Sequence, residues 1–172
     1  MKANHVKIEL KKLKLYPALS EETQAYSAAI FLDGRHIADV HNDGHGASDN
    51  VMPKAPFTYD QLLALEKRIA TEYPPLKSSI TGEHLPYTLE MLCGDLIHRA
   101  GVEKRLARAM KSKIVAIIDG TLSEFSFKGM KVLSPALSAQ LTPAILRKHP
   151  AAKLLNTLPL DEAVDAVLAI SK

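Results

Sequence analysis

Residues 41–46, with the sequence HNDGHG, gather more side chains able to do chemistry than any other stretch of this chain. Imidazole nitrogens and carboxylates are ligands that divalent transition metals accept. Because alternate residues of an extended backbone share a face, His41, Asp43 and His45 could converge on one ion, with Asp43 as a ligand or as a general base. The spacing matches no established metal motif. The loop is therefore a candidate metal or acid–base site defined by its residue types alone.

The same loop has two other interpretations. Asn42 and Asp43 could form local turn hydrogen bonds while the glycines take positive φ, as polar loops of this composition often do. Alternatively, backbone N–H groups around Gly44 and Gly46 could cradle an anion such as phosphate, and Asn42, Gly44 and Gly46 would then be binding residues. The run has neither a GxxxxGK[ST] pattern nor a complete GxGxxG pattern, which argues against ATP or NAD as the ligand.

A second candidate site is a basic face on a helix predicted to end near residue 110. On a helical wheel, four basic residues cover one arc opposite apolar residues: Lys104, Arg105, Arg108 and Lys111. Residues 99–113 hold six basic residues and one acid, Glu103. The N-terminal strand adds Lys2, Lys7, Lys11, Lys12 and Lys14 against Glu9. A phosphate backbone could use this local excess, while the alternative is a solvated helix face and lysines that protect a sheet edge.

Composition narrows the classes of protein to consider. A chain of 172 residues favours one domain over 1–172, with residues 76–86 as the one possible internal linker. The net charge of +3 creates no strong overall field, so any nucleic-acid argument depends on where the charges lie. Cys93 is the single cysteine, which excludes an intrachain disulfide and a multi-cysteine zinc site. The sequence shows no signal peptide and no membrane span, so we expect a cytoplasmic protein.

The N-terminal part predicts antiparallel strands. Apolar residues alternate with polar ones over 6–15, and the alternation slips at Lys11-Lys12, which indicates a β-bulge. Asp33-Gly34 between two apolar runs predicts a hairpin with a type I′ turn. The predicted cross-strand pairs are Ile30 with Ile37 and Phe31 with His36.

The rest of the chain predicts mainly helices. Thr58 and Gln61 form a capping box at the start of one helix, and a longer helix over 87–110 places Cys93 on its buried side and is weakened at Gly101. The remaining predictions are a hairpin at Asp119-Gly120, a short helix that begins at Thr142-Pro143, a brief strand at 154–155 and a last helix from Pro159. The fold class is therefore α+β, with an N-terminal antiparallel hairpin packed with several helices and a second short hairpin.

The stretch from Glu21-Glu22-Thr23 through Asp33-Gly34 to residues 42–46 resembles a group of uncharacterised proteins from bacteria, plasmids and phages. That group carries a similar DG…I…V.NDGHGG run, and it is also similar at Leu141-Thr142-Pro143, Lys148-His149-Pro150 and Leu155-Asn156. Ala47 stands where the group has a second glycine, which weakens a backbone cradle. The resemblance implies no activity or cofactor. An occurrence in mobile elements implies host defence or nucleic-acid handling.

These observations favour a non-enzymatic accessory or regulatory protein that binds nucleic acid or an acidic protein partner. The four basic residues of the helix would supply electrostatic contact, and the loop at 41–46 would supply specificity. The alternative is a metal-dependent hydrolase or nuclease with His41 and His45 as ligands and Asp43 as ligand or base. A third possibility is a structural or assembly component. The sequence does not indicate an oligomeric state.

Overall fold

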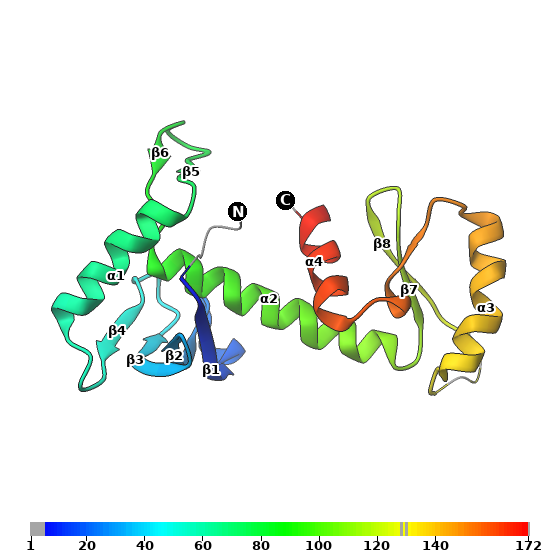
Figure 1. Ribbon diagram of the computed structural model, residues 1–172, viewed down its shortest axis with the longest axis horizontal. Coiled ribbons are helices and arrows are strands. Elements are labelled where there is room, and N and C mark those ends of the chain that lie inside the picture. The colour runs from blue at the N-terminus through cyan, green and yellow to red at the C-terminus, as the bar shows by residue number, and fades with distance from the viewer. Residues whose placement is uncertain (1–5, 128, 130, 172) are drawn as a thin grey trace. The chain divides into compact units, whose positions relative to one another are not determined.

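The computed structural model describes residues 6–127, 129 and 131–171, and the chain divides into two compact units, residues 1–97 and 98–172. Helix α2 (Leu89–Met110) contributes to both units (Figure 1). The division falls within this helix and not in the segment 76–86. That the chain is a single domain stays a prediction.

Unit 1 contains a four-stranded antiparallel sheet in the order β1-β2-β3-β4. Its strands are β1 (Ile8–Leu15), β2 (Tyr26–Leu32), β3 (Arg35–Asn42) and β4 (Asn50–Pro53). The predicted hairpin is confirmed, since Asp33 and Gly34 join β2 to β3 with φ values of 49° and 81°. The sequence did not predict β4, because this short edge strand ends in a proline and pairs, among the described strands, with β3 alone.

Two bulges set which side chains face away from the core. The predicted bulge in β1 is confirmed by a register shift between Lys11 and Lys14. A second bulge lies in β3, so Phe31 pairs with His36 as predicted, but Ile30 pairs with Ala38. The predicted pair of Ile30 with Ile37 is wrong because the extra residue in β3 moves the register by one.

Helix α1 (Tyr59–Glu72) begins with the predicted capping box: Gln61 N donates to Thr58 Oγ1 at 3.3 Å and Thr58 N donates to Gln61 Oε1 at 2.9 Å. The buried side chains of α1, of the sheet and of the start of α2 form the core of unit 1, and Ile30, Ile69, Leu89 and Cys93 are among those fully buried. The unit also contains η1 (Pro17–Leu19) and a two-stranded ribbon, β5 (Leu76–Lys77) with β6 (His84–Leu85).

Unit 2 has its own core, formed by the second part of α2, a small antiparallel sheet and a C-terminal helix. The sheet has the order β8-β7-β9, and its strands are β7 (Ile114–Ile118), β8 (Thr121–Phe125) and β9 (Lys153–Leu154). The other elements are α3 (Pro135–Lys148), η2 (Leu155–Thr157) and α4 (Leu160–Ile170). Fully buried residues of this core include Val115, Leu155 and Val164.

One helix prediction needs correction, and the prediction of a long helix near 87–110 is confirmed. Helix α3 begins after Ser134, whose hydroxyl accepts from Leu137 N at 3.2 Å, and Pro135 occupies the first turn, so Thr142-Pro143 lies inside the helix. The earlier Ser-Pro pair carries the same start signal as Thr-Pro, and local pattern alone does not decide between them. Helix α2 continues through Gly101, because Val102 and Leu106 are buried in the core of unit 2. The α+β class is confirmed.

Candidate functional site

Asn42, at the end of β3, organises the loop at 41–46. Its side chain is buried and makes four hydrogen bonds. Its Oδ1 accepts from Thr23 Oγ1 and from Gly44 N, both at 2.8 Å, and its Nδ2 donates to Ala47 O at 2.9 Å and to Asp49 Oδ1 at 3.1 Å. Such full satisfaction is what a buried amide requires. Asn42 therefore acts within the protein as a clamp between neighbouring loops.

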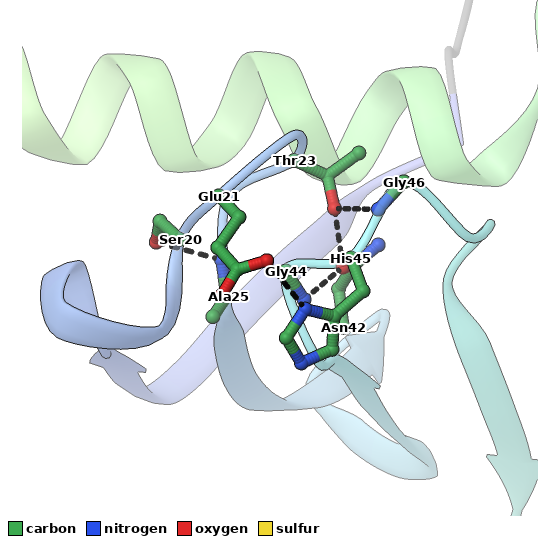
Figure 2. A network of polar contacts seen from close by, with 8 residues as sticks. All are labelled: Ser20, Glu21, Thr23, Ala25, Asn42, Gly44, His45 and Gly46. Atoms are coloured by element: carbon green, nitrogen blue, oxygen red, sulfur yellow. Dashed lines mark hydrogen bonds and ion pairs between the residues drawn. The ribbon is translucent and has the colours of Figure 1, made fainter.

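The glycines of this loop approach a second loop at residues 19–23 (Figure 2). The carbonyl oxygen of Gly44 accepts from three successive backbone N–H groups, those of Glu21, Glu22 and Thr23, at 3.1, 3.0 and 3.2 Å. The N–H of Gly44 donates to Asn42, and the N–H of Gly46 donates to Thr23 Oγ1 at 3.2 Å. Both glycine N–H groups already have acceptors within the protein, so they are not available to bind an anion as the cradle interpretation requires.

The structure does not bring the three predicted metal ligands together. His45 and Asp43 are exposed, and His45 Nδ1 lies 3.2 Å from Glu21 Oε2 (Figure 2). His41 lies on β3 beside a different surface, described below. The chain turns at Gly44, with φ of 88°, so the extended geometry that would align alternate residues is absent. Within the described ranges, no group of three or more His, Cys, Asp and Glu side chains could hold a metal ion.

The basic face of α2 lies in unit 2 and is accessible. The face consists of Lys104, Arg105 and Arg108 of α2 and of Lys111, which follows its last residue; all four are exposed, while Val102 and Leu106 on the opposite side are buried. Among the residues that the structure describes, none of these four cations has an acidic partner. Two nearby acids pair with other cations: Asp165 binds Arg99, and Glu124 lies 2.5 Å from Lys113 Nζ, which leaves Glu103 as one exposed carboxylate beside four cations. The face therefore keeps its positive charge.

Unit 1 has a further polar surface that the sequence did not single out, the outer face of its sheet. We use this name for the side of β1–β3 opposite the core, where Glu9, Lys11, Lys12, Lys14, Ser27, Ala29, Phe31, His36, Asp39 and His41 lie. An open groove of about 300 Å³ runs here between β1 and β3. Lysines of β1 line one side of the groove, Asp39 and His41 line the other, and alanines form its floor. Lys2 lies outside the described residues.

Beside this groove, three side chains from neighbouring strands stack in a row. The ring centroids of Phe31 and His36 are 5.1 Å apart with planes inclined by 10°, and Lys11 Nζ lies 4.3 Å from the Phe31 centroid. His36 Nε2 also lies 2.9 Å from Asp39 Oδ1. The predicted pairing of Phe31 with His36 indicated two members of this row. The sequence did not indicate that a lysine of β1 lies beside them.

Cys93, on α2, lies in the core of unit 1 close to Tyr26 and Asp49. The Tyr26 hydroxyl donates a hydrogen bond to Asp49, and burial raises the pKa of Tyr26, with that hydrogen bond as the second cause. Burial raises the pKa of the Cys93 thiol to about 12, and the Asp49 carboxylate acts in the same direction. A thiol in this setting is a poor nucleophile.

We therefore expect Cys93 of the folded protein to react very slowly with Ellman's reagent at pH 8. A pKa of about 12 leaves roughly one thiol in ten thousand as thiolate at that pH, and the side chain is fully buried. Urea should make the reaction rapid and stoichiometric, because the unfolded thiol has an ordinary pKa. A native reaction as fast as that in urea would contradict the burial of Cys93.

None of the described helices combines the length and the apolar character that crossing a membrane requires. Comparison with protein-family models, with curated proteins and with solved structures gives no match. The resemblance to proteins of bacteria, plasmids and phages stays a prediction. What the fold defines is an α+β protein with a buried polar clamp, a basic helix face and a basic, partly aromatic sheet face.

Proposed function

We propose that this protein is a non-enzymatic accessory protein that binds nucleic acid through the basic face of α2. The observation that carries the proposal is the set of four exposed cations, Lys104, Arg105, Arg108 and Lys111, which have no acidic partner in the described part of the chain. Phosphate groups gain affinity from such cations by releasing bound counterions. A role in handling nucleic acid also agrees with the resemblance to proteins of mobile elements.

Nucleic acid fits this face better than an acidic protein does. Protein interfaces usually centre on a desolvated apolar or aromatic anchor surrounded by polar residues. Of the apolar residues in this segment, Val102 and Leu106 are buried, and Ala109 and Met110 pack against the same core, so none of them is an exposed anchor. A phosphate backbone needs only positive charge at an accessible surface.

Replacing all four residues by glutamine should weaken binding of a random-sequence DNA duplex by roughly tenfold to a hundredfold at low salt. The slope of log affinity against log salt should become shallower by about 3 to 4, because each lost phosphate contact removes about 0.9. Fluorescence anisotropy over a series of salt concentrations measures both quantities.

A matched control removes four other exposed charges of unit 2, those of Lys131, Arg147, Lys148 and Lys153. This variant has the same net charge as the first, so it separates position from overall charge. An equal loss in both variants would show that the helix face is not a site. Unchanged affinity of the first variant for duplex DNA, for RNA and for polyglutamate would contradict the proposed function.

A further inference from the structure

The outer face of the sheet in unit 1 carries cations that the protein does not neutralise. Glu9 lies 3.4 Å from Lys7 and 3.7 Å from Lys11, so its charge is already shared by two lysines. Lys12 and Lys14 have no acidic partner among the residues that the structure describes, and both are exposed. Asp39, the acid on the far side of the groove, lies 2.9 Å from His36 Nε2, so the groove has one carboxylate against the two ammonium groups of Lys12 and Lys14. The groove is therefore suited to an anionic group.

The bulge in β1 creates this arrangement. Lys12 takes a φ of 55° at the register shift, and the strand resumes with Lys14 opposite Ser27. Without the added residue, Lys12 and Lys14 would not both line the groove beside His41. A non-glycine residue at positive φ costs free energy, and such residues often mark functional sites.

The row of Lys11, Phe31 and His36 lies directly beside the groove, and a face of the Phe31 ring becomes available to a base when the Lys11 ammonium group moves away from it. Aromatic rings next to cations are the usual means by which proteins bind single strands without sequence preference, since every base has a face that can stack. Phe31 is only partly buried although it belongs to the central strand β2.

We propose that the outer face of this sheet is a second binding surface, specific for single-stranded nucleic acid. A phosphate group occupies the groove next to Lys12, Lys14 and His41, and the neighbouring base stacks on the face of Phe31 that Lys11 now covers, with His36 stacked on the other face of the ring. The ammonium group of Lys11 then moves from the Phe31 ring to the next phosphate. This inference deepens the proposed function, on which it rests, by naming the kind of nucleic acid.

A duplex does not fit this surface in the same way. Its bases are stacked on each other and do not reach a ring that lies on a sheet, and its major groove admits a helix or a two-stranded ribbon. The central strand β2 has a paired neighbour on each side here, so the face is wider than such a ribbon. A single strand can turn its bases outward and follow the lysines of β1.

The test uses the full chain and a fluorescent oligothymidylate of about 15 nucleotides, a length near the upper end of known single-strand sites. Lys12→Gln with Lys14→Gln should weaken binding and make the salt slope shallower by about 1.4, at about 0.7 per lost contact. Phe31→Leu should weaken binding roughly tenfold and leave the salt slope unchanged, because stacking involves no counterion. Lys54→Gln with Lys67→Gln, which removes two exposed charges elsewhere in unit 1, is the matched control.

Duplex binding by the same variants distinguishes the two proposals and reports on folding. Both sheet variants should keep the wild-type affinity for duplex DNA, since the basic face of α2 is intact. Wild-type affinity of both sheet variants for oligothymidylate would overturn the second surface and leave the proposed function standing. If the wild-type protein binds neither nucleic acid, both proposals are overturned. Tighter binding of polyglutamate than of both nucleic acids would also overturn both.

Discussion

Gly44→Ala should lower the free energy of unfolding of unit 1 by roughly 3–5 kcal/mol, through two effects that add. The residue has a φ of 88°, where an alanine costs about 1 kcal/mol relative to glycine. A Cβ at this position would also lie 2.1 Å from the carbonyl oxygen of Leu19 and 3.0 Å from Ala25 Cβ. Relief of that contact means separating the two loops, and each of the three hydrogen bonds to the Gly44 carbonyl contributes about 1 kcal/mol.

Gly34→Ala is the matched control. Gly34 has a similar φ of 81°, but an added Cβ would have no described atom within 4 Å beyond Gly34 and its two chain neighbours, so only the conformational cost of about 1 kcal/mol applies. Urea unfolding followed by circular dichroism gives both free energies, and hydrogen exchange shows whether the amides of residues 21–23 lose protection. Equal destabilisation by the two substitutions would show that the loops at 19–23 and 41–46 are not held together as described.

The sequence of residues 41–46 predicted the conformation of this loop, but it did not predict which residues bind the loop. The composition of residues 41–46 indicated positive φ at the glycines, and both Gly44 and Gly46 have it. The donors that bind the loop come from residues 21–23, and nothing in local composition shows which distant segment will supply them. The metal interpretation depended on an extended backbone at these positions, and the turn at Gly44 removes that geometry.

The sequence also did not predict that the residues of the outer face of the sheet lie together. The sequence supplied each part: the lysines of β1, the bulge after Lys11 and the pairing of Phe31 with His36. Their convergence depends on β1 pairing with β2, a contact between segments that the periodicity of neither strand specifies. Strand β4 was also not predicted, because its four residues end in Pro53 and form a strand through their pairing with β3, which the local sequence does not show.

Asn156→Ala should destabilise unit 2 by roughly 2–4 kcal/mol, because its side chain joins three segments of that unit. Its Oδ1 accepts from Val115 N at 2.7 Å, and its Nδ2 donates to Lys113 O at 3.0 Å and to Met110 O at 3.4 Å. Val115 is fully buried, so loss of Oδ1 leaves its N–H without a partner in the core. Met110 is the last residue of α2, whose terminal carbonyls have no partner within the helix.

Thr157→Ala tests whether this effect belongs to the Asn156 side chain. The Thr157 hydroxyl donates to Leu154 O at 2.9 Å but is exposed, so its removal should cost less than about 1 kcal/mol. Because Asn156 holds the end of the helix that carries Lys104, Arg105 and Arg108, its loss should also increase hydrogen exchange in the last turn of α2. Binding of duplex DNA should weaken with an unchanged salt slope, since no cation is removed. If Asn156→Ala and Thr157→Ala have equal effects on unfolding, the side chain of Asn156 does not connect α2, β7 and η2 in solution.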